Sequence, residues 1–206
     1  MSDYTLPPRS TVICGMTGSG KTTFALRALI NIPCARFVFD DMGQASARLY
    51  RPHAATSHEL EAALATNWVL YNPHRMFPGQ VEKAFDFFCD WSFQKSVLVP
   101  THKIILADEV WRFMSPHQIP PALARLAQMG RAENAHLMIS TQVPHKIHAS
   151  ITGQATELVC FRLQEPLALD KVEELGADRA AIAALPLGQF IAYNRLSGQC
   201  LIGRVF

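Results

Sequence analysis

The sequence contains few charged residues, no internal repeat and no low-complexity tract. Charged residues make up 17% of the 206 residues and hydrophobic residues 49%, a balance that excludes a disordered chain or an acidic tail. Lysine and arginine number 19 against 17 for aspartate and glutamate, so the bulk charge carries no nucleic-acid signature and any DNA contact must come from a local patch. No linker rich in Gly, Ser or Pro divides the chain. We therefore expect one domain over residues 1–206 that buries a sizeable core and part of its apolar surface against partners.

Signals for export and for membrane insertion are also missing. Residues Met1–Arg9 lack the basic and apolar regions of a signal peptide, and no apolar run approaches the roughly 20 residues that a membrane span needs. The five cysteines are widely spaced and include no C-x-x-C pair, which indicates buried, reduced thiols. We therefore expect a soluble, cytoplasmic protein.

Residues Gly15–Thr22 fill every fixed position of the phosphate-binding pattern G-x-x-x-x-G-K-[ST]. The β-branched run Thr11–Cys14 precedes them and Thr23–Ile30, with helical spacing, follows, which disfavours a Gly-rich turn that matches by chance. Glycines let backbone N–H groups surround an anion, and the helix N-terminus adds partial positive charge. Lys21 would reach the β- and γ-phosphates of ATP and Thr22 would ligate Mg²⁺. The residues expected to contact the nucleotide are Gly15, Thr17, Gly18, Ser19, Gly20, Lys21, Thr22 and Thr23.

Two adjacent carboxylates end the apolar run Ile104–Glu109. A buried parallel strand delivers its last side chains to the carboxyl edge of the sheet, where open α/β folds bind ligands. We expect Asp108 to hold the Mg²⁺ shell, directly or through water, and Glu109 to orient and deprotonate the attacking water. A helix-capping turn is the alternative, which the upstream phosphate loop makes the weaker interpretation. The aromatic residues of Trp111–Phe113 are interpreted as core or interface packing rather than as a loop that couples hydrolysis to a pore.

A further apolar run, His136–Ser140, ends in Thr141 and Gln142. The amide of Gln142 can bond both a γ-phosphate oxygen and the lytic water, so we expect it to be a sensor of hydrolysis.

Strand-like and helix-like segments alternate along the chain, which predicts an α/β domain with a mainly parallel sheet flanked by helices. The turn Arg195–Gln199 predicts a hairpin that places an antiparallel edge at the end of the chain. Strands are expected near Thr11–Cys14, Arg36–Asp40, Trp68–Tyr71, Lys103–Ala107, His136–Ser140, Glu157–Phe161, Gln189–Tyr193 and Cys200–Val205. Helices are expected at Thr22–Ile30, Ser57–Ala65, Pro78–Phe93, Pro120–Gly130, Ala168–Leu175 and Asp178–Ala184.

The segment Leu123–Pro144 resembles the FtsK/HerA superfamily of DNA-pumping ATPases, in which a helix carries an arginine just before the sensor strand, followed by Thr-Gln and a proline. Leu187–Tyr193 is similar to the Gly-containing start of the family's final hairpin. The resemblance runs from about Thr11 to the C-terminus. It implies a RecA-like P-loop NTPase fold, ATP and Mg²⁺ as cofactors, double-stranded DNA as partner and a homo-oligomeric ring, in the family a hexamer.

The small size of the chain is most similar to the genome-packaging ATPases of membrane-containing and double-jelly-roll viruses. For such a protein the resemblance implies action in the host cytoplasm or at the packaging vertex, with portal, capsid-vertex or membrane proteins as further partners. A cellular or plasmid DNA translocase or helicase remains an alternative, as does a phage assembly or export ATPase that acts on protein. The chain departs from the family in having no winged helix and no separate N-terminal barrel, which leaves target recognition open.

The resemblance also implies that Arg131 is an arginine finger that reaches the ATP of a neighbouring subunit, with Arg125 as a weaker candidate. Arginine suits transition-state charge on a phosphoryl group. An arginine near a helix C-terminus is commonly only a partner of the helix dipole or a solvated side chain, so that interpretation stays open for both residues.

Overall fold

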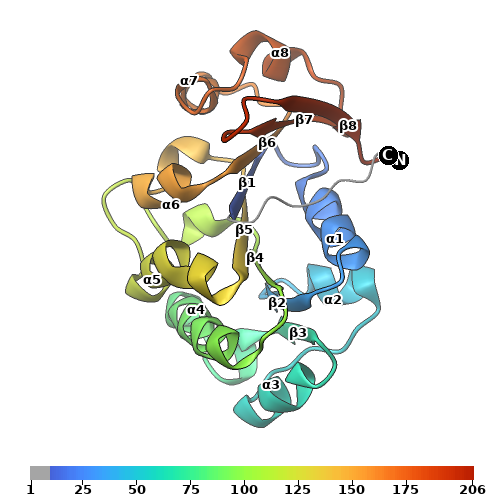
Figure 1. The fold of residues 1–206 in the computed structure, drawn as a ribbon, viewed down its shortest axis with the longest axis vertical. Helices are drawn as coiled ribbons and strands as arrows, with labels where there is room; N and C mark the ends of the chain where they lie inside the picture. The colour runs from blue at the N-terminus through green and yellow to red at the C-terminus, as the bar shows by residue number, and fades with distance from the viewer. Residues whose placement is uncertain (1–9) are drawn as a thin grey trace.

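An eight-stranded sheet forms the centre of the structure, a computed structural model that describes residues 10–206 (Figure 1). The expectation for Met1–Arg9 lies outside the described residues. The strands lie in the order β3-β2-β4-β5-β1-β6-β7-β8. They are β1 (Ser10–Cys14), β2 (Ala35–Phe39), β3 (Trp68–Tyr71), β4 (Lys103–Ala107), β5 (Ala135–Thr141), β6 (Glu157–Phe161), β7 (Gln189–Asn194) and β8 (Cys200–Arg204).

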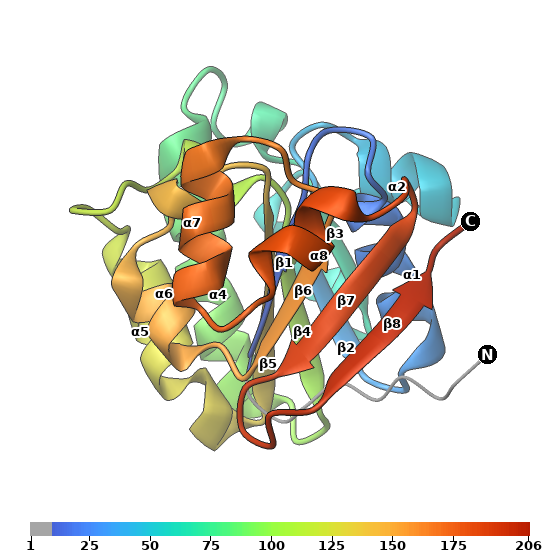
Figure 2. The same ribbon diagram turned by 90° about the horizontal axis from the view of Figure 1, so that it is seen from above.

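The first six strands pair in parallel, and the last two are antiparallel to their neighbours. All residues of β1, β4, β5 and β6 are buried, as expected for parallel strands that are covered on both faces. The hairpin of β7 and β8 lies at one end of the sheet (Figure 2), and α1 (Lys21–Asn31) follows β1 in the chain. The predicted α/β class, mainly parallel sheet and final antiparallel hairpin are therefore confirmed.

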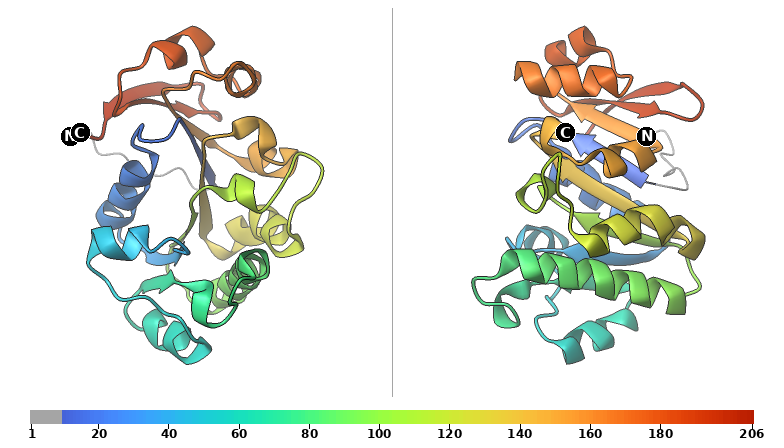
Figure 3. Two further views of the ribbon diagram at one scale, coloured as in Figure 1. Left: turned by 180° about the vertical axis from the view of Figure 1, so that it is seen from behind. Right: turned by 90° about the vertical axis from the view of Figure 1, so that its left-hand side faces the viewer.

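Helices cover both faces of the sheet (Figures 1 and 3). On one face α1 packs its Phe24 and Leu29 against the strands, and on the other Phe85, Phe88 and Trp91 of one long helix are buried. Over residues 10–206, none of the helices is both long and apolar enough to cross a bilayer. The remaining helices are α2 (Gln44–Leu49), α3 (Ser57–Leu64), α4 (Val81–Leu98), α5 (Pro121–Met129), α6 (Ala149–Gln154), α7 (Pro166–Glu174) and α8 (Arg179–Ala184).

The helix expected at Pro78–Phe93 begins later and ends later, at Val81 and Leu98. Its end depends on a residue of another element: the buried Nζ of Lys103, at the start of β4, donates to the carbonyls of Ser96 at 2.9 Å and Val99 at 2.6 Å. These are carbonyls that the end of a helix leaves without an intrahelical partner. The lysine therefore extends the helix beyond the point that its own sequence indicates.

Two of the three six-residue helices, α2 and α6, were not predicted because their sequences show little periodicity, whereas α8 was predicted. The carboxylate of Asp40 accepts from the N–H groups of Ala45 and Ser46, at 2.9 and 2.8 Å, at the start of α2. At the start of α6, Nδ1 of His148 accepts from the N–H of Ser150 at 3.2 Å. Both caps are of the kind that polar side chains provide.

We expect Lys103→Met to lower the free energy of unfolding by about 1–3 kcal/mol, because it leaves the carbonyls of Ser96 and Val99 without their buried donor. Chemical denaturation measures the change. Lys95→Met is the matched control, because it removes an ammonium from the same end of the helix. The partner of that ammonium, at 2.8 Å, is the exposed carboxylate of Glu61, so the loss of unfolding free energy should be much smaller. Equal stability of the two variants would contradict the capping role.

Candidate functional site

The loops that follow β1, β4 and β5 meet at one edge of the sheet, around a cavity of about 730 Å³. These strands are neighbours, so their carboxyl ends lie together, where α/β sheets bind ligands. The cavity contains most of the residues predicted for the site and six that were not. Its lining is Thr17, Gly18, Gly20, Lys21, Thr22, Thr23, Met42, Gln44, Arg48, Asp108, Glu109, Trp111, Arg112, Gln142 and Phe206.

The phosphate loop is held in shape by its own lysine. The buried Nζ of Lys21 donates to the carbonyls of Gly15 at 2.9 Å and Met16 at 3.3 Å, which turns those carbonyls toward the lysine. Gly18 and Gly20 have φ angles of +73° and +115°, a region that favours glycine. A Cβ on Gly20 would also come within 2.6 Å of Val205, so the loop could not take this path with a larger residue there.

The loop fits a phosphate. Within residues 10–206, the N–H groups of Gly18 and Gly20 donate no hydrogen bond, and α1 begins without a side-chain cap or an acidic residue in its first turn. Free N–H groups, the helix N-terminus and the ammonium of Lys21 together favour an anion. Gly15 and Ser19 lie behind the cavity wall: Ser19 is buried, its Oγ has no partner in the described chain, and its carbonyl accepts from the N–H of Gly188 at 3.1 Å.

Asp108 and Thr22 form an oxygen pair beside the loop. Oδ2 of Asp108 accepts from the hydroxyl of Thr22 at 2.7 Å, and Oδ1 accepts from the hydroxyl of Ser140. Among residues 10–206 there is no group of three or more His, Cys, Asp or Glu side chains that could hold a metal. A carboxylate and a hydroxyl fit Mg²⁺, which is commonly bound through one or two protein oxygens, substrate phosphates and water.

Glu109 lies between the phosphate loop and the sensor strand. Its Oε1 is 3.3 Å from Nζ of Lys21, while its Oε2 accepts from Nε1 of Trp111 at 2.9 Å and from the N–H of Gln142 at 3.2 Å. The backbone of Glu109 is left-handed, with φ of +50°. Such a conformation is uncommon for a residue with a side chain and is found where surrounding contacts enforce it.

Gln142 faces the loop from β5. Its Oε1 accepts from the hydroxyl of Thr17 at 2.5 Å, so the predicted sensor and the phosphate loop touch directly. The structure therefore brings together Lys21, Thr22, Asp108, Glu109 and Gln142, all of them expected from the sequence.

Arg131 lies far from this cavity. It is exposed in the 3₁₀ turn Gly130–Glu133, which precedes β5, whereas the cavity lies beyond the other end of that strand. With seven residues at about 3.3 Å each, β5 separates the two by roughly 20 Å. Within the described residues Arg131 makes no ion pair, whereas Arg125 pairs with Asp90 and lies over the ring of Phe93.

Four of the six cavity residues that sequence reasoning missed come from segments with no motif, and the other two, Trp111 and Arg112, directly follow the acidic pair. Met42, Gln44 and Arg48 belong to α2 and the loop before it, and Phe206 follows β8. Phe206 lies over Gly188, where a Cβ would come within 2.5 Å of its ring. The only signal available beforehand was the pattern of a glycine before the final hairpin.

Arg112 connects the acidic pair to the loop after β2. Its Nη1 donates to Oδ2 of Asp41 at 2.8 Å, and the carbonyl of Asp41 also lies 2.8 Å from Nε2 of His74. The guanidinium of Arg112 is thus neutralised by this chain, although it lines the cavity.

No protein-family model and no curated protein matches the chain. Solved structures do match it. The genome packaging NTPase B204 from Sulfolobus turreted icosahedral virus 2, in complex with AMP, has a TM-score of 0.75 and 16% sequence identity, with 97% of this chain and 98% of that chain covered. Other structures of B204 are complexes with ATP-gammaS or AMPPCP.

Two further solved structures also match the chain. VirB4 of Thermoanaerobacter pseudethanolicus has a TM-score of 0.66 and 12% identity, covering 96% of this chain and 89% of that one. The pCW3 conjugation coupling protein TcpA, with ATPgS, has a TM-score of 0.59 and 15% identity, covering 96% and 60%. At these identities the likeness is one of fold. This chain therefore has the P-loop NTPase fold of B204, VirB4 and TcpA, the fold that the resemblance to the FtsK/HerA superfamily implies.

Proposed function

We propose that this chain is a Mg²⁺-dependent ATPase that translocates double-stranded DNA, and that it packages a viral genome. The observation that carries the proposal is the meeting of Lys21, Thr22, Asp108 and Glu109 at one cavity, with contacts that suit a triphosphate and its metal. The nearly complete mutual coverage with a genome packaging NTPase supports the packaging role. The proposed place of action is the host cytoplasm or the packaging vertex. The proposed further partners are portal, capsid-vertex or membrane proteins.

In this mechanism the chain binds the triphosphate and removes a proton from water. Lys21 and the loop N–H groups bind β- and γ-phosphate oxygens, and Gln142 orients the water. Glu109 takes one proton from that water, whose oxygen forms the new bond to the γ-phosphorus as the bond to the β–γ bridging oxygen breaks, giving ADP and phosphate. Thr22 and Asp108 would hold Mg²⁺, which neutralises phosphate charge.

Action as a ring follows from the position of Arg131 in this proposal. Roughly 20 Å of strand separates it from its own cavity, so it can serve only the cavity of another chain. A hexameric ring, as the FtsK/HerA resemblance implies, would bring each Arg131 to a neighbour's γ-phosphate. Its exposure and its lack of an ion pair within the described residues leave it available for this contact.

A plasmid or cellular DNA translocase is the second candidate, because the conjugation coupling protein TcpA shares the fold. A capsid gene beside the gene for this chain would favour packaging, and conjugation genes would favour the second candidate. The two candidates share the same chemistry at the same residues.

The test of DNA translocation is the ATPase rate with and without double-stranded DNA, measured together with particle mass by light scattering. We expect DNA to raise the rate and the active particle to contain six chains. A rate that ignores DNA but responds to a partner protein would replace the DNA motor with an assembly or export ATPase.

Lys21→Ala and Glu109→Gln should fail at different steps. Lys21→Ala removes the cation that faces the transferred phosphoryl group, so ATP binding or turnover should be lost. Glu109→Gln keeps shape but cannot accept a proton, so turnover should fall by about 10²- to 10⁴-fold while ATP still binds. Steady-state ATPase and titration with a fluorescent ATP analogue measure both steps. Normal turnover in Lys21→Ala rules out the phosphate-loop assignment, and lost ATP binding in Glu109→Gln makes that residue structural.

Arg131→Ala tests the ring. It should bind ATP nearly normally and lose roughly 10³-fold or more in turnover, the scale of an arginine finger. Mixed with Glu109→Gln, which keeps its own Arg131, it should regain part of the ATPase, because some interfaces then pair an intact site with an intact arginine. Mixtures that co-assemble without any recovery would exclude action in trans.

A further inference from the structure

We propose that Trp111 is a positioning residue for Glu109, and that its indole N–H fixes which carboxylate oxygen accepts the proton from water. The inference rests on the proposed ATPase function and deepens it at the same site. The sequence favoured packing over a coupling loop for this aromatic side chain.

The two oxygens of Glu109 have different partners. Oε2 accepts two neutral N–H donors, the indole of Trp111 at 2.9 Å and the backbone of Gln142 at 3.2 Å. Oε1 has the ammonium of Lys21 at 3.3 Å. Oε2 is therefore held by two donors of the chain. Oε1 is held by a lysine that a bound phosphate would also attract.

A bound triphosphate would separate these roles. Its oxygens compete for Lys21, which leaves Oε1 of Glu109 with fewer donors, while the two N–H donors on Oε2 come from Trp111 and Gln142, outside the phosphate loop. A carboxylate anchored through one oxygen presents the other in a fixed direction. Oε1 is then the atom that takes the proton, and Trp111 supplies half of the anchor.

The ring of Trp111 is itself fixed. It lies in the 3₁₀ turn Val110–Arg112, is half-buried at the cavity wall, and has Nζ of Lys146 at 5.1 Å from its centroid. Lys146 belongs to the turn that follows Gln142, so the indole connects the acidic pair with the segment after the sensor.

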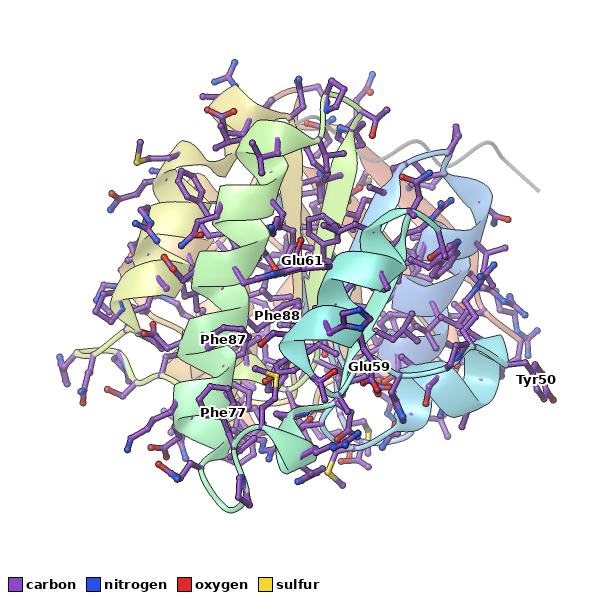
Figure 4. All side chains as sticks on the ribbon, turned by 90° about the horizontal axis from the view of Figure 1, so that it is seen from below. Tyr50, Glu59, Glu61, Phe77, Phe87 and Phe88 are labelled. Atoms are coloured by element: carbon purple, nitrogen blue, oxygen red, sulfur yellow. The ribbon has the colours of Figure 1, made fainter. Side chains whose placement is uncertain are left out.

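Trp91 offers a matched control within the same chain. Its Nε1 donates to Oε1 of Glu61 at 3.2 Å, and Nζ of Lys95 lies 6.0 Å from its ring. Glu61 lies on α3, facing α4 (Figure 4), and neither residue lines the cavity. Trp91→Phe thus removes the same N–H from the same kind of acceptor, beside the same kind of cation, away from the proposed chemistry.

The experiment compares Trp111→Phe with Trp91→Phe in ATPase assays with Mg²⁺ and double-stranded DNA. For Trp111→Phe we expect kcat to fall by about 10- to 100-fold with KM within about twofold. Loss of kcat without a matching rise in KM is the result expected when the carboxylate is bound but poorly oriented. Trp91→Phe should match the wild type in kcat and in KM.

A second variant separates the N–H from the shape of the ring. Benzothienylalanine, placed at position 111 by nonsense suppression, keeps the bicyclic ring and lacks the N–H, so it should reproduce the kinetic changes even if Trp111→Phe fails to fold. Wild-type kcat and KM in this variant would overturn the proposal, as would equal kinetic losses in Trp91→Phe. Full activity of Glu109→Gln would instead overturn the ATPase mechanism itself.

Discussion

Every contact of the site depends on the parallel pairing of β4, β5 and β1, which ends three strands at one edge of the sheet. Ala107 lies opposite Ile139, and Cys14 lies opposite Thr141, so the residues after these strands meet. Side chains alternate along a strand, and a slip of one residue would send Asp108 to the opposite face of the sheet. Because every residue of these strands is buried, such a slip would exchange the side chains packed on the two faces and disrupt the fit of both. Packing of the core thus determines the chemistry at its edge.

Several polar side chains of the site find their partners within the chain. Lys21 is buried, and an unpaired buried ammonium is strongly unfavourable, yet two carbonyls and Glu109 surround it. The left-handed backbone of Glu109 costs about 1–3 kcal/mol, which contacts from Lys21, Trp111 and Gln142 offset. A triphosphate would exchange some of these contacts for stronger ones. The same side chains therefore stabilise the free site and become available to the phosphates.

The sequence predicts the elements whose signal is local and misses those that need a distant partner. All eight strands and the phosphate loop follow from apolar runs and glycine spacing, and the acidic pair follows from its place after a buried strand. The end of α4 at Lys103, the start of α2 at Asp40 and the bond of Trp111 to Glu109 involve residues that only the folded chain brings together. Neither the local sequence signal nor the fold of one chain tests the proposed role of Arg131, because that role involves a second chain.

The cations at the cavity limit how this chain can stabilise a transition state. Two guanidiniums line it, and Arg112 is committed to Asp41. Arg48 is exposed, with one contact at 3.4 Å to the hydroxyl of Thr23 in the first turn of α1, so it is the guanidinium within the chain that could move to a phosphate. Transition-state charge in phosphoryl transfer commonly requires an arginine beyond the loop lysine. A full loss of turnover in Arg131→Ala would mean that Arg48 contacts phosphate only in the ground state. Partial activity would mean that Arg48, on the short helix α2 that no sequence pattern predicts, stabilises part of the transition-state charge.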